Sequence, residues 1–185
     1  MQRFTPRGVF GGVTNHIVAL VPSEDTPAAV SELYRQYWVG LVRLAVLVVD
    51  DRESAEDVVQ EVFTELYRKW PLDDSNKVLG YLRTAVLNRS RSVLRRRRVA
   101  RLYTPPSARS GDSAESAAVV GENRQEVQRA LQALPIRSRE VLVLRYYLDL
   151  PYAEIGQTLG ISESTARATA SRGLAALTKK LKETR

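Results

Sequence analysis

The chain has 185 residues, 44% of them hydrophobic, and its 28 Lys and Arg against 21 Asp and Glu give a net charge of +7. It has no cysteine and one histidine, which excludes a disulfide framework and a thiolate metal site. The positive charge is typical of a protein that approaches a polyanion, although a membrane surface or a ribosome would attract it as well. No apolar run reaches the roughly 20 residues that span a bilayer, and residues 17–21 are too short for a signal-peptide core, so we expect a cytoplasmic protein.

Residues 1–26 are predicted to form a flexible N-terminal extension, because glycine and proline are frequent in this segment. Beyond Pro27 the pattern is almost entirely helical. Residues 28–49 are expected to form the first helix, since their apolar side chains fall on one continuous stripe. The stripe consists of Val30, Leu33, Tyr34, Tyr37, Leu41, Leu44, Ala45 and Val48.

A second amphipathic helix is predicted to open at Ser54 and to end before Pro71, with apolar residues at helical spacing from Ala55 to Trp70. Its polar face is acidic and holds Glu56, Asp57, Gln60, Glu61 and Glu65. Compensation of the helix macrodipole accounts for acids in the first turn but hardly for those further along. We therefore favour a docking face for a basic partner.

A polar loop, residues 73–77, precedes a third helix that runs from about Val78 into a cluster of arginines. Between Leu82 and Leu102 there is no acid to compensate them, which favours a phosphate-binding helix. Tyr81 could stack on a base, with core packing as the alternative, and the amides of Asn76 and Asn88 could hydrogen-bond one. The arginines are Arg83, Arg89, Arg91, Arg95, Arg96, Arg97, Arg98 and Arg101.

Residues 102–122 are rich in proline, glycine, serine and alanine and are predicted to form a flexible linker. The expected fold is therefore all-α, with two small helical domains, residues 27–101 and 123–185, on either side of this linker. Two basic surfaces joined by a linker strengthen each other, because the second DNA contact becomes intramolecular once the first has formed.

The C-terminal segment has the pattern of a helix-turn-helix. A short helix over residues 152–159 is followed by Gly160, which can adopt the positive φ of a sharp turn, and by Ser162, which can cap the next helix. That helix is predicted from about Glu163 to Lys180. A helix of this kind fits the DNA major groove, although an ordinary helical bundle has the same spacing. The expected buried residues are Ala166, Ala170, Leu174 and Leu177, and the expected outward residues are Ser164, Thr165, Arg167, Ala168, Ser171 and Arg172.

The order of these elements resembles the extracytoplasmic-function (ECF, group IV) sigma factors of bacterial RNA polymerase, in the sigma-70 family, over residues 28–181. Two stretches carry the resemblance, AEDVVQEVFTELYRKW and LPIRSREVLVLRYYLDLPYAEIGQTLGIS. The run ATASRGLAAL resembles the pattern of an actinobacterial subgroup. The chain departs from the usual pattern at residues 165–169, where one customary arginine is missing, and at Tyr81, where tryptophan is commoner.

The resemblance implies a function in promoter recognition and DNA melting, with core RNA polymerase (the β′ clamp helices and the β subunit) and promoter DNA as partners and an anti-sigma factor as a candidate partner. It implies no catalysis, small-molecule substrate, cofactor or metal. The linker would run towards the active-site cleft and the RNA exit path. The implied sites are Asp57, Gln60 and Glu61 for core polymerase, Asn76, Tyr81, Asn88, Arg91, Arg95 and Arg96 for the −10 element, and Ser164, Thr165, Arg167, Ser171 and Arg172 for the −35 element.

Two other classes of protein compete with this interpretation. A stand-alone helix-turn-helix regulator would need a receiver or ligand-binding domain upstream, and no strand pattern indicates one. A helical nuclease or transferase would need a His/Cys cluster, a glycine-rich phosphate loop or a nucleophile motif, none of which is found in the sequence.

Overall fold

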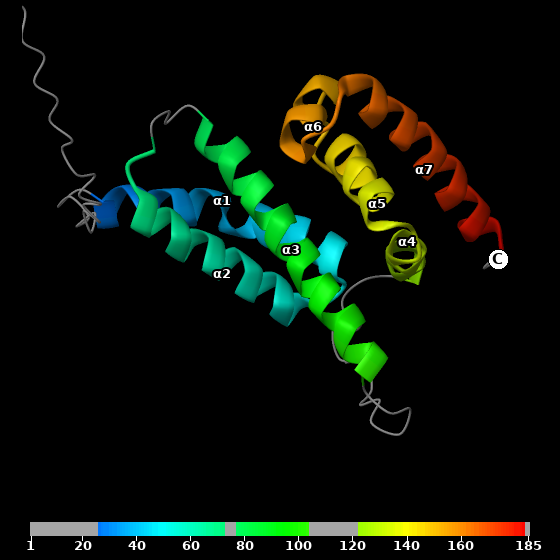
Figure 1. Ribbon diagram of the computed structural model, residues 1–185, viewed down its shortest axis with the longest axis horizontal. Helices are drawn as coiled ribbons and strands as arrows, with labels where there is room; N and C mark the ends of the chain where they lie inside the picture. Colours follow the sequence, from blue (N-terminus) through cyan, green and yellow to red (C-terminus); the bar gives the residue numbers. More distant parts are fainter. Residues whose placement is uncertain (1–25, 73–76, 104–121, 184–185) are drawn as a thin grey trace, which may run out of the picture.

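The computed structural model describes residues 26–72, 77–103 and 122–183 (Figure 1). Over these ranges it contains seven α-helices, one π-helical turn and no strand, so the expected all-α class is confirmed. The predicted N-terminal extension, the predicted linker and the loop residue Asn76 lie outside the described residues, except for the ends of the two segments. The division into two domains therefore stays a prediction.

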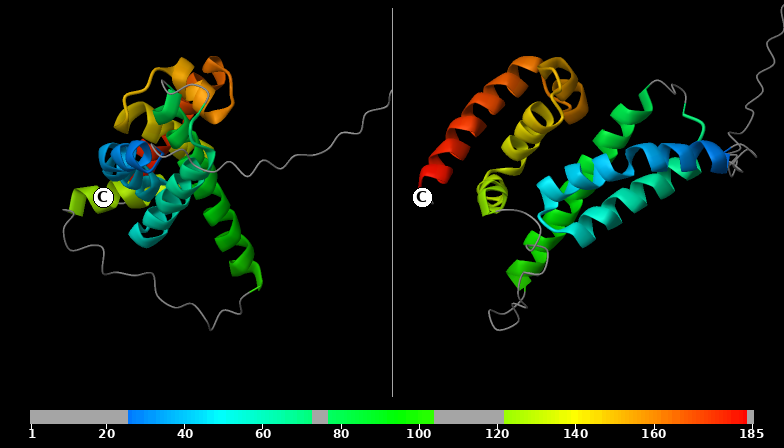
Figure 2. Two further views of the ribbon diagram at one scale, coloured as in Figure 1. Left: turned by 90° about the vertical axis from the view of Figure 1, so that its left-hand side faces the viewer. Right: turned by 180° about the vertical axis from the view of Figure 1, so that it is seen from behind.

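The N-terminal half consists of α1 (Thr26–Val49), α2 (Arg52–Lys69) and α3 (Val78–Tyr103). Helices α1 and α2 lie side by side and α3 crosses them, so that each contacts the other two (Figures 1 and 2). The apolar stripes predicted for α1 and α2 face each other and α3, because burying them together removes them from water. The most buried residues of the three helices include Leu44, Val48, Val58, Val62, Leu66, Leu82 and Leu87.

Helix α2 begins at Arg52, two residues before the predicted start at Ser54. Asp51 is the N-cap, and its side chain accepts a hydrogen bond from the backbone N–H of Ser54 at 2.8 Å. An aspartate in this position satisfies one of the free N–H groups of the first turn, which is why the helix starts earlier. The predicted end is confirmed, since Trp70 has an extended conformation and precedes Pro71.

The C-terminal half consists of α4 (Glu122–Gln132), α5 (Ile136–Leu142), a π-helical turn (Val143–Tyr147), α6 (Tyr152–Leu159) and α7 (Glu163–Glu183). Helix α7 packs against α4, α5 and α6 (Figures 1 and 2). The sequence analysis did not anticipate the π-helical turn. It widens the end of α5 so that the backbone N–H of Leu148 binds the carbonyl of Val143 at 3.2 Å, and that of Leu150 binds the carbonyl of Leu144 at 3.0 Å.

The helix-turn-helix is confirmed in its predicted details. Helix α6 ends at Gly160 with a φ of 66°, and the Oγ of Ser162 accepts a hydrogen bond from the N–H of Thr165 at 3.1 Å. Gly156 is also required, because a Cβ there would lie 2.7 Å from the carbonyl oxygen of Ile161. The close approach of α6 to this turn fixes the direction in which α7 leaves it.

The predicted buried face of α7 is wrong at one position. Ala166 and Ala170 are buried, but Leu174 is 42% exposed, and Gly173 faces the core in its place. A Cβ on Gly173 would lie 3.4 Å from side-chain atoms of Leu142 and Ser138, so α5 and α7 are in close contact at this residue. Because Gly173 faces α5, the next residue, Leu174, points about 100° away from this contact and towards solvent.

The two halves of the chain share buried apolar surface. One continuous cluster contains Leu44 and Leu87 from the first half and Val141, Leu144 and Ile155 from the second. Polar contacts accompany this packing at the end of α1, where the side chain of Gln132 donates to the carbonyl of Leu47 at 3.2 Å and that of Arg139 donates to the carbonyl of Val48. These carbonyls are free at a helix C-terminus, so the second half supplies their hydrogen-bond donors.

Candidate nucleic-acid interface

Fewer arginines of α3 are available to a partner than its sequence indicates, because four of the eight bind acids that lie outside this helix. Arg83 binds Glu154 of α6 at 2.9 Å, and Arg91 binds both carboxylate oxygens of Glu140 of α5, at 2.5 and 3.0 Å. The sequence has no acid between Leu82 and Leu102, but for these two arginines the compensating acids come from other helices. The acids are distant in the sequence and become neighbours only through the packing of the helices.

The other two engaged arginines of α3 lie against α2. The guanidinium of Arg89 lies 3.2 Å from Glu61 and 3.3 Å from Glu65. That of Arg97 donates to Asp51 at 2.5 Å, to the carbonyl of Val49 at 3.0 Å and to the hydroxyl of Ser54. Arg97 thus stabilises the junction between α1 and α2.

The remaining arginines of α3 form what we call the α3 arginine surface. They are exposed and lie towards the C-terminal end of α3, which projects beyond the other helices in Figures 1 and 2. Exposed guanidinium groups on a projecting helix are accessible to the phosphates of a duplex. The α3 arginine surface consists of Arg95, Arg96, Arg98 and Arg101.

The other residues predicted for −10 recognition differ in exposure and in their partners. Tyr81 is half-buried and packs against the apolar core, as the alternative of a core aromatic had predicted. Asn88 is exposed, and its side-chain oxygen accepts a hydrogen bond from Arg91 at 2.7 Å. The N–H groups of Arg91 that bind Glu140 are not available to a phosphate in this arrangement.

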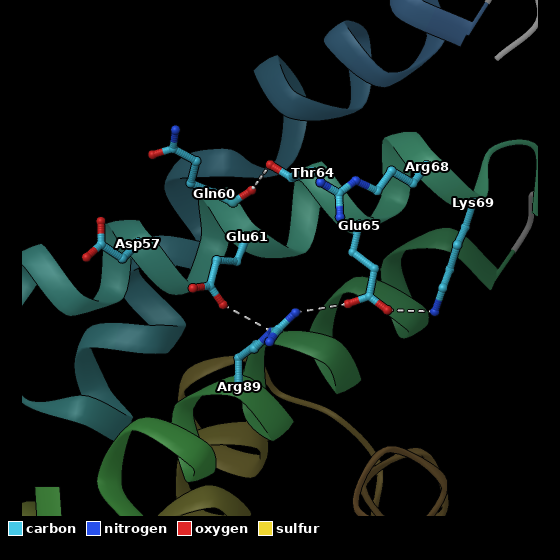
Figure 3. A pocket seen from close by; sticks show the side chains of 8 residues that line it. All are labelled: Asp57, Gln60, Glu61, Thr64, Glu65, Arg68, Lys69 and Arg89. Atoms are coloured by element: carbon cyan, nitrogen blue, oxygen red, sulfur yellow. Dashed lines mark hydrogen bonds and ion pairs between the residues drawn. The ribbon is translucent and has the colours of Figure 1, made fainter. Parts of the chain in front are cut away.

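An open groove runs along the acidic face of α2 (Figure 3). Glu65 binds both Lys69, at 2.6 Å, and Arg89, and the hydrogen bond from Lys69 is the main reason that the pKa of Glu65 is lowered. The predicted docking residues have different environments. Asp57 and Gln60 are exposed at one end of the groove, whereas Glu61 binds Arg89. The lining residues are Asp57, Gln60, Glu61, Thr64, Glu65, Arg68, Lys69 and Arg89.

The predicted −35 residues are all exposed on α7. Their hydroxyls are partly engaged, because the Oγ of Ser162 lies 3.0 Å from that of Ser164 and 2.8 Å from the Oγ1 of Thr165. The guanidinium of Arg167 binds Glu163 at 2.6 Å and lies over the ring of Tyr152, 5.2 Å from its centroid. The exposed residues are Ser164, Thr165, Arg167, Ser171 and Arg172.

Two charged residues that the sequence analysis missed, Arg139 and Glu140, are buried where the halves meet. Glu140 has no exposed surface, and burial raises the pKa of its carboxyl against the opposing effect of Arg91. Burial likewise lowers the pKa of Arg139, whose guanidinium donates to backbone carbonyls that include that of Leu131 at 3.1 Å. The signal in the sequence is an adjacent base and acid at the head of an apolar run, a position where charged side chains need partners.

Among the described residues, no helix is long and apolar enough to cross a membrane. The same residues contain no group of histidine, aspartate and glutamate side chains that could hold a metal ion.

Comparisons with known proteins agree with the two halves of the fold. Residues 33–99 match the family model for Sigma-70 region 2, and residues 124–177 match that for Sigma-70, region 4. The chain is 31% identical to the RNA polymerase sigma-E factor of Streptomyces antibioticus, over 83% of this chain and 84% of that protein. It is also 31% identical to the ECF RNA polymerase sigma factor SigE of Mycolicibacterium smegmatis. The aligned segment covers 84% of this chain and 60% of that protein.

Two solved structures have a similar fold. CnrH, solved in complex with the cytosolic domain of CnrY, superposes with a TM-score of 0.65 at 24% identity. The superposition covers 85% of this chain and 90% of the CnrH chain. The sigma factor RpoE of Bartonella quintana, solved with the anti-sigma factor NepR, gives a TM-score of 0.64 at 19% identity over 84% and 98% of the two chains.

The match to region 2 excludes the stand-alone regulator considered above, because that segment would then have to be a receiver or ligand-binding domain. The two relatives named above come from actinobacteria, as the sequence pattern of α7 had indicated. With both sigma-70 regions in order on an all-α fold, the chain belongs to the ECF (group IV) sigma factors of the sigma-70 family, which function in transcription initiation.

Proposed function

We propose that this sigma factor binds core RNA polymerase through α2 and brings two basic surfaces, on α3 and α7, to the −10 and −35 elements of a promoter. The proposal is carried by one observation: a chain that matches both sigma-70 regions exposes Asp57 and Gln60 at a groove of mixed charge on α2, and exposes arginines on α3 and α7. The proposed division is a region 2 domain over residues 27–101 and a region 4 domain over residues 123–185.

The contact with core polymerase is assigned to Asp57, Gln60 and Glu61, facing the β′ clamp helices, with the β subunit as a further contact. Asp57 and Gln60 are exposed, whereas Glu61 is shared with Arg89 at 3.2 Å. We therefore assign the larger share of the docking energy to Asp57 and Gln60, since their polar groups can meet a basic partner without breaking an ion pair.

The −10 contact is assigned to α3 and the loop before it. The exposed Arg95 and Arg96 would bind phosphates, and the loop with Asn76 would accept a base that has left the stack. Unstacking a base costs a few kcal/mol, and a pocket that accepts only the flipped base offsets that cost, so melting needs no hydrolysis. The remaining members of this site are Tyr81, Asn88 and Arg91.

The −35 contact is assigned to the exposed face of α7. A helix can enter the major groove with its N-terminal residues towards the base edges, and an arginine can bind guanine there through two hydrogen bonds. Arg167 is our candidate for base recognition. Ser164, Thr165, Ser171 and Arg172 complete the site.

We propose further that the protein acts in the cytoplasm, where the polymerase is, without catalysing a reaction and without a cofactor. An anti-sigma factor is proposed as an additional partner, because the RpoE protein of similar fold was solved in complex with one.

The decisive experiment adds the full chain to bacterial core RNA polymerase and a library of genomic DNA fragments, and measures run-off transcripts. Transcripts that start at defined sites only when the chain is present support the proposal. Their absence, with a chain that is folded by circular dichroism, contradicts it.

The docking surface is tested with Asp57→Arg, which should abolish co-purification with core polymerase because it repels a basic partner. Glu32→Arg is the matched control, since Glu32 is an exposed acid on α1, away from the groove. Both variants should keep the helicity of the wild type. Retained binding by a folded Asp57→Arg variant would contradict the assignment.

A further inference from the structure

Tyr152, the first residue of α6, contacts two arginines that come from other segments. The Cζ atom of Arg145, in the π-helical turn, is 5.3 Å from the centroid of its ring, and that of Arg167, in α7, is 5.2 Å away. Guanidinium groups within about 6 Å of an aromatic centroid are attracted by the electron-rich face of the ring. Three segments of the helix-turn-helix therefore meet at one half-buried side chain.

Each arginine has a further contact that limits its movement. Arg145 donates to the carbonyl of Leu150 at 3.1 Å and to the carboxylate of Asp149 at 3.3 Å. Arg167 binds Glu163 one turn earlier in α7, at 2.6 Å. Arg167 thus contacts a carboxylate on its own helix and a ring on the preceding one, and these two contacts restrict a side chain that is otherwise 64% exposed.

This confinement matters because an exposed arginine has many rotamers, and fixing one of them on binding reduces affinity. A guanidinium already confined in the free protein loses less freedom when it meets a base edge or a phosphate. The ring has a second advantage over an acid, since its attraction leaves the N–H donors at the edge of the guanidinium available to DNA.

We propose that Tyr152 is a positioning residue for −35 recognition, and that its ring holds Arg167 in the orientation in which α7 presents it to DNA. The inference rests on the proposed function of Arg167. It assigns the effect to the face of the ring and not to the hydroxyl group of Tyr152.

The test uses holoenzyme reconstituted from core polymerase and the full chain. The probe is a set of duplexes whose upstream element has been selected by the wild-type holoenzyme from a randomised pool. Tyr152→Phe keeps the ring and should bind like the wild type. Tyr152→Leu removes the ring and should weaken binding by about two- to fivefold, the range expected for one exposed cation–π contact, and relax selectivity at the base position that Arg167→Ala also relaxes.

A double-mutant cycle separates positioning from a general effect on the fold. In an Arg167→Ala background, Tyr152→Leu should cause little further loss of binding, because the group that the ring positions is gone. If Tyr152→Leu unfolds the domain, as judged from its thermal melting, Tyr152→Met is used in the same cycle, since it retains more of the apolar volume.

Three results would contradict either this inference or the function proposed for Arg167. An equal loss in Tyr152→Phe and Tyr152→Leu would overturn the inference in favour of a contact made by the hydroxyl. Additive losses in the double variant would overturn it in favour of a structural role. Unchanged binding and selectivity in Arg167→Ala would instead refute the proposed function of Arg167 itself, whatever the variants of Tyr152 do.

Discussion

At the scale of single residues, neighbouring arginines of α3 have different environments although the sequence shows them as one cluster. Arg95 and Arg96 are exposed, whereas Arg97 binds the N-cap of α2 and the last carbonyl of α1. Successive residues on a helix point about 100° apart, so one of three can face the protein while the others face solvent. A test of phosphate binding should therefore replace Arg95, Arg96 and Arg98 and retain Arg97.

The first prediction follows from this difference. Arg97→Ala should lower the free energy of unfolding by about 1–3 kcal/mol, because it removes hydrogen bonds from a charged donor to Asp51 and to the carbonyl of Val49. Arg95→Ala, the matched control, should change it by less than about 0.5 kcal/mol. Urea unfolding of the free chain measures both values. Equal effects of the two substitutions would contradict the structural role of Arg97.

A second prediction concerns Glu163, whose carboxylate lies 2.6 Å from Arg167 on the proposed DNA-facing side of α7. Glu163→Gln should strengthen binding to duplexes of any sequence, because it removes a negative charge near the phosphates and leaves the charge of Arg167 uncompensated, while the ring of Tyr152 still confines its guanidinium. The slope of log affinity against log salt should become steeper. Binding titrations of holoenzyme at several salt concentrations measure this slope, and an unchanged slope would argue against a DNA contact here.

At the scale of elements, the sharpest constraint lies in the turn of the helix-turn-helix. Gly160 has a positive φ and Gly156 has no room for a side chain, so two glycines four residues apart permit one tight connection. The direction of α7, and with it the orientation of the recognition face, depends on this connection. Helix propensity alone would favour alanine at Gly156.

The third prediction compares two glycine substitutions within helices. Gly156→Ala should destabilise the protein by about 1–3 kcal/mol, because the new Cβ would lie 2.7 Å from the carbonyl oxygen of Ile161. Gly40→Ala should instead stabilise it by about 0.5–1 kcal/mol, since nothing lies within 4 Å of a Cβ at that site in α1. Thermal melting followed by circular dichroism measures both. A Gly156→Ala variant as stable as the wild type or more stable would show that the turn relaxes.

At the scale of the whole molecule, the two halves are joined by apolar contacts and by polar ones, among them the ion pair of Arg91 and Glu140. Removing Arg91 would leave a carboxylate with no exposed surface without its closest cation, a change that typically costs about 3–5 kcal/mol. A loss of DNA binding in Arg91→Ala would therefore mix an effect on the fold with an effect on the contact. Arg95 and Arg96 are better probes of the −10 site for this reason.

The fourth prediction uses the pH dependence of stability. Burial raises the pKa of Glu140 in the folded chain above its ordinary value of 4.5, so the folded state holds this proton more tightly than the unfolded state. Its contribution should therefore become more favourable as the pH falls through the raised pKa towards 4.5, and should be constant below that value. The difference in unfolding free energy between the wild type and Glu140→Gln, measured over this range, should move in favour of the wild type. A difference that moves in the opposite direction would mean that the ion pair outweighs burial.

The sequence by itself determined the all-α class, the boundaries of α1, α6 and α7 to within a few residues, and the turn at Gly160. Each of these depends on local spacing, capping and the conformational freedom of glycine, which a linear pattern contains. It also determined which residues of α7 are exposed, apart from Leu174, because helical periodicity separates one face from the other.

Only the tertiary structure decided which charges are available. Four arginines of α3 are bound by acids that lie outside it in the sequence, so no pattern within α3 could show that they are engaged. These acids are Asp51, Glu61 and Glu65, Glu140 and Glu154. The same holds for the contact of Tyr152 with Arg145 and Arg167, which three separate segments create. Local structure follows from short-range sterics and hydrogen bonding, whereas the partner of a charged side chain depends on how the helices pack.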